Sequence, residues 1–494
     1  HNMAFLTEAA NRGSISTGPY QIENSSVWEP DLLDQAYLSQ GSTAGTRTKQ
    51  TFSVWIKRTE LDSDQYIFEG GTGSANDTQF GIQFSASNKL QIMRGHTGGG
   101  YQYLLNTNRL FRDMYAWYHI VVAIDTTLST ADNRVRLYVN GIEETDFGNR
   151  NNPSQNDNLG TFAANSQISL GVSANLGKYI AAYIAHPALV YNAQLPPTDF
   201  GEFDSDSNIW IPKDLSAIDF GTYGYWLKNE TSNQMYNDSS GNSRNFGRWD
   251  ATIYQSTDTP TNNFPVLIPM YKPSSSCILS KGSLQWDVNM PSNSAFNPNT
   301  SAMSSFQVSG TNGGKWYIES KLTNNERGFV GIVSSLAYLR QTTDPTEFVY
   351  WDFYNGWIGS SIISTETNPP GASANDIIGI ALDCDNQRVT FSKNGGWLAA
   401  NGDMTGGSPS DWRWDWTSDA NFLDHPNCNG NIAFWCGTQT DANTYRPIHQ
   451  VNFGGYAPYT ISSGNSDANG YGNFEYAVPS GFYALCTKNL AEYG

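Results

Sequence analysis

Charged residues, cysteine and long apolar runs are all scarce in this chain of 494 residues. Charged side chains make up 15% of it, and the formal net charge of -18 argues against nucleic acid as a partner. No apolar run reaches about 18 residues, so membrane insertion is not expected. The five cysteines form no CxxC pair, which excludes the usual zinc patterns and favours buried or idle thiols. They are Cys277, Cys384, Cys428, Cys436 and Cys486.

Short catalytic signatures are also missing. The six histidines form no HExxH pair, and neither a GxSxG elbow nor a Walker loop is present. His119, inside "WYHIVV", is better explained as a strand residue than as a catalytic base. Nothing in these patterns indicates an enzyme.

Aromatic residues, at 13%, and 46 glycines are abundant, and many short β-branched or aromatic segments alternate with turns. A chain of this length exceeds the roughly 300 residues of one core, so two domains are expected. The pattern predicts an all-β protein built from two antiparallel β-sandwiches joined by an irregular linker. We expect an N-terminal segment at 1–27, a sandwich at 28–228, a linker at 229–275, and a second sandwich with a C-terminal extension at 276–494.

Two segments share one strand-and-turn pattern. "RVTFSKNG" ends at Asn394-Gly395 and "NRVRLYVNG" ends at Asn140-Gly141, and both dipeptides favour tight hairpin turns. "DIIGIALDC", which precedes the first of them, has little polar face and predicts a strand buried on both sides. We expect Asp383 and Asp385 to lie in the turn between these strands and not to act as an acid-base pair.

These segments carry a resemblance. "GKWYIESKL", "GFVGIVS", "DIIGIALDCDNQRVTFSKNGGWL" and "VNFGG" follow one another as in the SPRY domain family. The first half, with "QTFSVWIKR" and "WYHIVVAIDTTLSTADNRVRLYVNG", resembles laminin-G or concanavalin A-like jelly rolls.

Three further phrases are similar to phage-encoded proteins that are usually interpreted as tail-fibre or related virion components. They are "YQIENSS…AYLSQGSTAGTRTKQTFSVWIKR", "DTPTNNFPVL" and "GNSDANGYGNFEYAVPSGFYALCTKNL". The resemblance implies a protein made in the host cytoplasm and carried on the tail or another external surface of the virion. It also implies a homo-oligomer, commonly a trimer.

The jelly-roll resemblance raises two site questions. Laminarinase-like glycoside hydrolases of this shape carry E-x-D-x-x-E, and "GEFDSDSN" (Glu202, Asp204, Asp206) lacks the final Glu and is typical of a loop. Laminin-G-like domains often hold one calcium ion at a loop rim, so a structural calcium is the one cofactor considered. Its candidate ligands, with solvated turn acids as the alternative, are Asp62, Asp64, Asp125 and Asp132.

Aromatic residues near turns are the candidates for ligand binding. In "SDWRWDWTSD", Trp412, Trp414 and Trp416 share one face if the segment is extended, and such a row suits either a core or a sugar platform. In "YWDFYNGWIG", Tyr354 and Trp357 are further candidates, and they too suit either a core or a sugar platform. "GHTGGGYQYLL" places Tyr101 and Tyr103 beside a Gly-rich loop, where exposure competes with hairpin packing.

The favoured hypothesis is a non-catalytic tail-fibre or adhesion protein whose loops recognise a host cell-surface glycan or protein. The alternative is a purely structural head or tail decoration protein that binds other virion proteins. A glycan-degrading enzyme is a lesser alternative.

Overall fold

The computed structural model describes most of the chain, in separate stretches. They are residues 20–29, 36–72, 79–95, 101–173, 177–232, 234–249, 253–269, 277–288, 295–296, 301–324, 326–334, 348–353, 356, 358–360, 363–366, 371–399, 404, 407–410, 414–415, 430–437, 439–440 and 446–494. The described chain divides into two compact units between Thr261 and Asn262. We call them the first and the second domain and describe each by itself.

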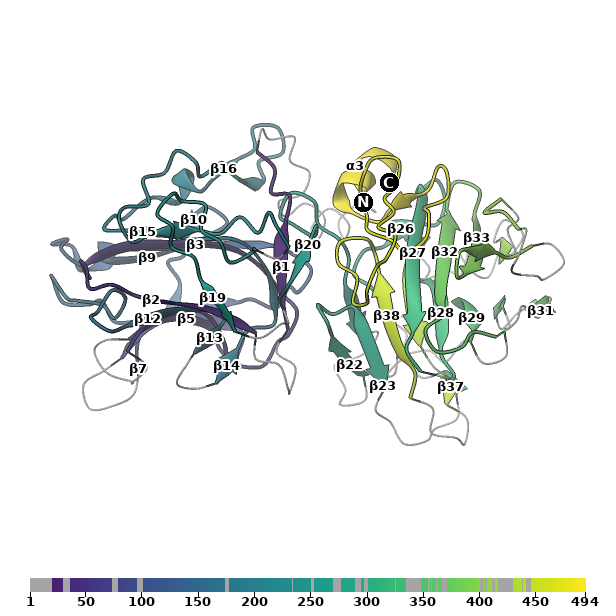
Figure 1. Cartoon of the computed structure of the whole chain (residues 1–494), viewed down its shortest axis with the longest axis horizontal. Helices are drawn as coiled ribbons and strands as arrows, with labels where there is room; N and C mark the ends of the chain where they lie inside the picture. Colours follow the sequence, from purple (N-terminus) through teal and green to yellow (C-terminus); the bar gives the residue numbers. More distant parts are fainter. Residues whose placement is uncertain are drawn as a thin grey trace. The chain divides into compact units, whose positions relative to one another are not determined.

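The first domain is a sandwich of two antiparallel sheets, drawn as two layers in Figure 1. The strands of sheet A run, in spatial order, β10 (Ile142–Glu143), β9 (Val135–Val139), β8 (Tyr118–Asp125), β3 (Lys49–Arg58), β15 (Ala182–Tyr191), β1 (Ser25–Trp28) and β20 (Ile253–Ser256), with β18 (Tyr225–Trp226) beside β15. Those of sheet B run β11 (Phe147–Arg150), β7 (Tyr101–Leu110), β6 (Lys89–Gly95), β5 (Phe80–Phe84), β4 (Gln65–Gly71), β12 (Gln167–Leu170), β2 (Tyr37–Gly41) and β19 (Gly247–Trp249).

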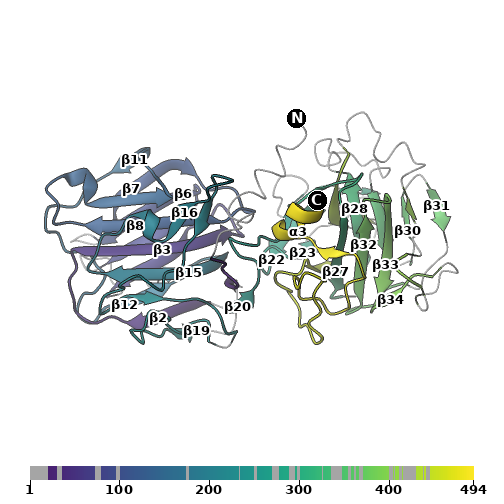
Figure 2. The same cartoon turned by 90° about the horizontal axis from the view of Figure 1, so that it is seen from above.

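Apolar residues of both sheets meet between the layers. Phe52 of β3 and Phe68 of β4 pack with 4.9 Å between ring centroids, inside a core cluster that draws on both sheets. The other face of sheet A carries a second cluster around Val121, Ala123 and Trp226. Residues 195–228 cover it, and they include η2 (Pro197–Asp199), β16 (Gly201–Phe203) and β17 (Trp210–Pro212). Figure 2 looks down on this covering segment, with β16 in front of β3.

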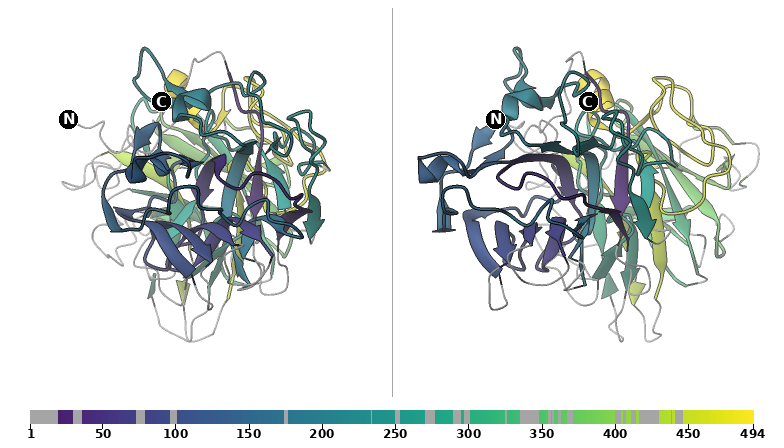
Figure 3. Two further views of the ribbon diagram at one scale, coloured as in Figure 1. Left: turned by 90° about the vertical axis from the view of Figure 1, so that its left-hand side faces the viewer. Right: turned by 60° about the vertical axis from the view of Figure 1, so that its left-hand side comes forward.

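Three short elements complete the described part of the first domain. They are η1 (Ala131–Asn133) and the pair β13 (Val172–Ser173) and β14 (Lys178–Tyr179). Figure 3 shows the same two layers from two further directions.

The second domain is also a sandwich of two sheets. The first sheet runs β21 (Leu267–Pro269), β25 (Ala302–Ser304), β36 (Asn431–Gly437), β28 (Phe329–Ser334), β29 (Phe348–Asp352), β30 (Ile358–Ser360) and β31 (Ile363–Glu366), with β26 (Val308–Ser309) beside β36. The second sheet runs β22 (Cys277–Ser280), β23 (Gln285–Val288), β38 (Ile448–Asn452), β27 (Lys315–Leu322), β32 (Ile377–Asp383), β33 (Arg388–Lys393) and β34 (Gly396–Trp397), with β35 (Trp414–Asp415) beside β33 and β39 (Tyr483–Ala484) beside β27. A small pair, β24 (Ala295–Phe296) and β37 (Gln439–Thr440), and the helix α3 (Thr487–Tyr493) complete its described elements. Trp351 of β29 meets Phe391 of β33 edge to face at 5.9 Å, which joins the two layers.

The all-β prediction is confirmed, and so are the two hairpins. β33 pairs with β34 across Asn394-Gly395, and β9 pairs with β10 across Asn140-Gly141. β32, which pairs with β33, is buried along its whole length. Asn394 and Gly395 have φ of 51° and 79°, and Asn140 and Gly141 have φ of 50° and 77°, the positive values that this turn requires. A Cβ on Gly141 would lie 2.2 Å from the Trp210 ring, so packing requires glycine there as well.

Asp383 lies at the end of β32 and not in the turn that follows it. It is 2% exposed, and its Oδ2 lies 3.2 Å from both Lys315 Nζ and Arg388 Nε. Asp385 is in the turn, as predicted, and its Oδ1 accepts a hydrogen bond from the backbone N–H of Gly314. Both carboxylates therefore have structural partners.

The predicted linker at 229–275 is divided between the two domains. β20 pairs with β1 and β19 pairs with β2, so both extend the first sandwich, whereas β21 pairs with β25 of the second. The polar composition of this segment hid these edge strands, because edge strands bury little apolar surface. The four cysteines in the described stretches, Cys277, Cys384, Cys436 and Cys486, are free and buried. No helix in the described residues is long and apolar enough to cross a membrane.

A buried ion pair holds Asp258, the first residue of the phrase "DTPTNNFPVL", in the first domain. Lys57 Nζ lies 2.7 Å from Asp258 Oδ2, and the two side chains are 0% and 2% exposed. Trp117 Nε1 donates to Asp258 Oδ1 at 3.1 Å. Burial lowers the pKa of Lys57, and the attraction of Asp258 opposes that shift. The phage-like phrase thus begins with a structural contact.

The last phage-like phrase covers the second domain. Residues 456–486, which we call the C-terminal cover, pack Phe474, Phe482 and Ala484 against Tyr317 of β27 and Ala381 of β32. Glu319, which is 0% exposed, accepts hydrogen bonds from the backbone N–H groups of Glu475 and Tyr476 and from the hydroxyls of Tyr317 and Tyr459, at 2.8 to 3.1 Å. Burial raises the pKa of Glu319, and these four donors oppose the shift.

Candidate ligand-binding face

A polar face that is exposed at Tyr103 and Asn149 lies at the β11–β7 edge of sheet B. Met93 pairs with Tyr103, whereas Gln91 pairs with Asn106, because a β-bulge shifts the register between β6 and β7. Cross-strand partners share one face of a sheet, so the bulge brings Tyr103 and Asn106, three residues apart, to the same face. Asn149 of β11 pairs with Asn106 and extends this face.

Hydrogen bonds hold the amides of this face in a row. Gln83 Nε2 donates to Gln91 Oε1 at 2.7 Å, and Gln91 Nε2 donates to Asn106 Oδ1 at 3.3 Å. Asn151 Nδ2 donates to Asn149 Oδ1 at 2.7 Å and to the backbone O of Tyr103 at 3.0 Å. We call Tyr103, Asn106, Asn149 and Asn151 the Tyr103 face.

The Tyr103 face retains unused hydrogen-bonding groups. Tyr103 is 38% exposed, and Asn149 and Asn151 are exposed as well. Within the described residues, the Tyr103 hydroxyl and the Nδ2 groups of Asn106 and Asn149 have no hydrogen-bond partner. An aromatic ring beside free amide donors can stack on the C–H face of a sugar and bond its hydroxyls.

The other predicted aromatic positions are less defined. Trp412, Trp416, Tyr354 and Trp357 lie outside the described residues. Trp414 is in β35, where its backbone pairs with Val389 at the edge of the second domain. Tyr101 begins β7 and pairs with Gly95. The sequence indicated Tyr103 but gave no signal for Asn149, which reaches this face through the pairing of β11 with β7, or for Asn151, which follows β11.

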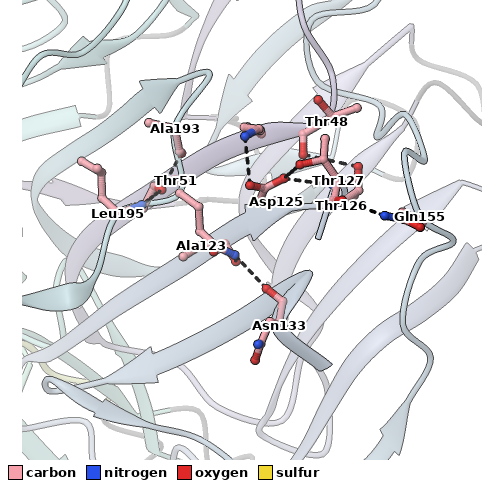
Figure 4. Close-up of polar contacts among 12 residues, drawn as sticks. Thr48, Thr51, Ala123, Asp125, Thr126, Thr127, Asn133, Gln155, Ala193 and Leu195 are labelled. Carbon is pink, nitrogen blue, oxygen red and sulfur yellow. Dashed lines mark hydrogen bonds and ion pairs between the residues drawn. The ribbon is translucent and has the colours of Figure 1, made fainter. Parts of the chain in front are cut away.

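The predicted calcium ligands are each engaged by protein groups. Lys49 Nζ lies 3.1 Å from Asp125 Oδ2, and the backbone N–H and hydroxyl of Thr127 donate to Asp125 Oδ1 at 2.9 and 2.6 Å (Figure 4). Partial burial acts to raise the pKa of Asp125, but the bonds from Thr127 and Lys49 outweigh it and lower that pKa. Asp132 Oδ1 accepts from Asn152 Nδ2 at 2.6 Å.

The other two predicted calcium ligands make local contacts. Asp62 Oδ1 accepts from Asn88 Nδ2, and Asp64 Oδ1 accepts from the backbone N–H of Ala86. No group of three or more His, Cys, Asp or Glu side chains suited to a metal ion occurs in the described stretches. The four aspartates therefore do not converge on a single point.

His119 and Ser53 form a buried hydrogen-bonded pair. In this pair the histidine donates to the serine hydroxyl, which is the opposite of what activation of a serine nucleophile requires. Trp210 Nε1, which can only donate, lies 2.9 Å from His119 Nδ1, so Nδ1 is the acceptor. In the neutral ring the proton is then on Nε2, which donates to Ser53 Oγ at 2.9 Å. Burial lowers the pKa of His119 to about 3, so the ring is neutral and cannot take a proton from Ser53.

The near-match to a glycosidase motif is a turn. Asp204 Oδ1 accepts hydrogen bonds from the backbone N–H groups of Asp206 and Ser207 and from the Ser207 hydroxyl. Glu202 lies in the short strand β16, which pairs only with β17 in the described structure. The loop interpretation of "SDSN" is therefore confirmed.

Comparison with known families agrees with this architecture. Residues 34–198 match the family model described as the concanavalin A-like lectin/glucanases superfamily, and residues 299–404 match the SPRY domain model. The chain therefore carries a laminin-G-like (concanavalin A-like) β-sandwich followed by a SPRY β-sandwich. Neither match concerns a phage fibre, so the phage resemblance stays a prediction. A search of the curated proteins finds no match.

Solved structures with similarity to parts of the chain include three from different sources. A SAP-like pentraxin from Limulus polyphemus is 13% identical, with a TM-score of 0.27, over 36% of this chain and 80% of that one. The SPRY domain of human HERC1 is 13% identical, with a TM-score of 0.27, over 37% and 96%. The CBM40 of the Ruminococcus gnavus IT-sialidase, bound to α2,3-sialyllactose, is 14% identical, with a TM-score of 0.22, over 33% and 86%.

Proposed function

We propose that this chain is a non-catalytic, glycan-binding virion protein of the tail-fibre or adhesion type, and that the Tyr103 face of its first domain contacts a host-surface glycan. The observation that carries the proposal is an exposed tyrosine beside unused amide donors. It lies on a sandwich that matches the model of the concanavalin A-like lectin/glucanases superfamily. Neutral sugars suit this face, because stacking and amide hydrogen bonds need no opposite charge.

Attachment to a virion rests on the three phage-like phrases. Multiple copies on one particle, in trimers as the resemblance implies, would raise the avidity of a weak single site. The chain needs no calcium in this proposal, since protein groups already engage Asp62, Asp64, Asp125 and Asp132.

A structural decoration protein is the second candidate, and one observation favours it. Two of the phage-like phrases form buried contacts, through Asp258 and through the C-terminal cover, so both phrases have a structural role in this fold. Phrases with a structural role need no contact with a host, which fits a protein that binds only other virion proteins.

Binding and adsorption assays separate these candidates. The labelled full chain is applied to a panel of host-surface polysaccharides, and the unlabelled chain is tested as an inhibitor of particle adsorption. We expect saturable binding to at least one polysaccharide and inhibition of adsorption. Binding to virions but to no polysaccharide, with adsorption unchanged, would support the decoration protein, and release of reducing sugar would show an enzyme.

A further inference from the structure

A second candidate site lies on the first domain, in the segment that covers sheet A. A pocket of about 610 Å³ opens between the end of β15, η2 and the turns that follow β17. This volume is in the range of small-molecule sites. Its lining residues are Tyr191, Asn192, Ala193, Leu195, Asp199, Lys213, Asp214, Ala217, Ile218, Asp219, Gly221 and Thr222.

The walls of the pocket are fixed by contacts to sheet A. Thr51 Oγ1 donates to the backbone O of Ala193 and accepts from the backbone N–H of Leu195, both at 2.9 Å (Figure 4). Next to these residues, Gln194 Nε2 donates to the backbone O of Asn133 in η1 at 2.9 Å and to that of Ala123 in β8 at 3.4 Å. On the other side, Leu215 and Phe220 are buried in the cluster beneath. The pocket is therefore formed before any ligand arrives.

The charge of the pocket is mostly negative. It contains three aspartates and one lysine, and the ammonium of Lys213 donates to the backbone O of Thr198 at 3.0 Å. Asp214 accepts from Ser216 through both carboxylate oxygens, and Asp219 Oδ1 accepts from the N–H of Gly221. The side chain of half-buried Asp199 has no hydrogen-bond or ion-pair partner in the described part of the chain.

The three carboxylates do not gather as metal ligands do. The described residues contain no group of three acidic, histidine or cysteine side chains that could hold an ion. The lining also includes the apolar side chains of Leu195 and Ile218 and the polar side chains of Asn192 and Thr222, the last two at exposed positions. Such a lining suits an organic cation with both an apolar surface and hydroxyl groups.

We infer that this pocket binds an amino sugar, with the protonated amine at Asp199 and the hydroxyls at Asn192 and Thr222. The inference deepens the proposed glycan-binding function. It rests on that function only in taking the ligand to be a sugar. The unpartnered carboxylate supplies the charge complement, and the net charge of -18 adds a long-range attraction for cations.

Calorimetric titration of the full chain with glucosamine, N-acetylglucosamine and glucose tests the inference. We expect glucosamine to bind about tenfold more tightly than the two neutral sugars, since only it carries a cation. Asp199→Asn should remove this preference, and higher salt should reduce it. Asp206→Asn, which removes the same charge from an exposed turn of the same domain, should not change it.

Equal affinity for glucosamine and N-acetylglucosamine would overturn the inference, and so would an unchanged preference in the Asp199→Asn variant. Preserved thermal unfolding of that variant shows that a loss of binding is local. Tyr103→Ala should leave glucosamine binding intact, so the Tyr103 face and this pocket can fail independently.

Discussion

In the first domain the outer face of β7 leaves Tyr103 38% exposed, whereas in the second domain Tyr317 of β27 is 0% exposed beneath the C-terminal cover. Both tyrosines lie on a sheet face that points away from the core between the two sheets. In the second domain the chain itself covers that face, whereas in the first domain the part of the face at Tyr103 and Asn149 is exposed, although Met93 and Gln91 beside it are buried. A sandwich face is available for recognition only where no segment of the protein covers it.

In each domain, a buried charged side chain also fixes a segment from the C-terminal end of that domain. Asp258 is fixed by Lys57 and Trp117, while Glu319 fixes the C-terminal cover through four donors. The first network is an ion pair and the second is a carboxylate surrounded by neutral donors. The predictions below test how far the two arrangements differ.

The largest expected effect comes from Lys57→Met. The variant removes the ammonium that lies 2.7 Å from the buried carboxylate of Asp258, and removal of one partner of a buried pair costs about 3–5 kcal/mol. The unfolding free energy of the first domain should fall by about that amount in denaturant titrations. In Lys57→Met/Asp258→Asn most of the loss should be recovered. Equal instability of the single and double variants would contradict the ion-pair account.

Glu319→Ala should destabilise the second domain by about 3 kcal/mol, because two backbone N–H groups and two tyrosine hydroxyls lose their acceptor. The C-terminal cover should then open more readily, which hydrogen exchange at Glu475 and Tyr476 would measure. Glu492→Ala removes an exposed carboxylate from α3 and serves as the control. Unchanged exchange in Glu319→Ala would show that packing alone holds the cover.

Acid should destabilise both domains through their buried histidines. Burial lowers the pKa of His119, His186 and His449 to about 3, whereas an unfolded histidine titrates near 6.5. Below about pH 6.5 the unfolded state binds more protons than the folded state, so stability falls as the pH falls toward 3. Each histidine contributes a slope of about 1.4 kcal/mol per pH unit within that window.

Substitution of His449 measures the contribution of a single histidine to the pH dependence of stability in the second domain. Its Nε2 is buried without a partner in the described structure, between Trp286 and Phe353. Between pH 6 and 4, the unfolding free energy of His449→Phe should change less steeply with pH. The difference in slope should be about 1.4 kcal/mol per pH unit, which corresponds to one proton. An unchanged slope would show that this ring is already charged in the folded protein.

The smallest expected effect is that of a chelator. Protein groups already contact the four candidate aspartates, namely those of Lys49, Thr127, Asn152, Asn88 and Ala86. EDTA should therefore shift the unfolding free energy by less than about 0.5 kcal/mol. A larger loss that added calcium restores would establish a structural calcium site.

Local patterns predicted the fold well, because strand alternation and Asn-Gly turns depend on neighbouring residues. "RVTFSKNG" is the clearest case, with its partner strand and its turn both confirmed. The burial of Thr390 could not be predicted, because its cross-strand partner Ala381 packs with Phe474 of the distant C-terminal cover.

The candidate site was predictable only in part for the same reason. Tyr103 stood out beside a Gly-rich loop, but the bulge that aligns it with Asn106 and the pairing that adds Asn149 are properties of the sheet. Asp199 and Asp219 line one pocket because residues 191–222 fold back over sheet A. A short sequence motif cannot predict this arrangement, because the two residues are 20 positions apart.

The most direct test of the central claim compares two exposed tyrosines of the first domain. Tyr103 is 38% exposed on the Tyr103 face, and Tyr254 is 44% exposed on the edge strand β20 of the other sheet. With the polysaccharide that binds best, calorimetry should give about tenfold weaker binding for Tyr103→Ala and wild-type affinity for Tyr254→Ala. Both variants should keep wild-type stability, as exposed substitutions do. Wild-type affinity in Tyr103→Ala, or an equal loss in both variants, would contradict the account.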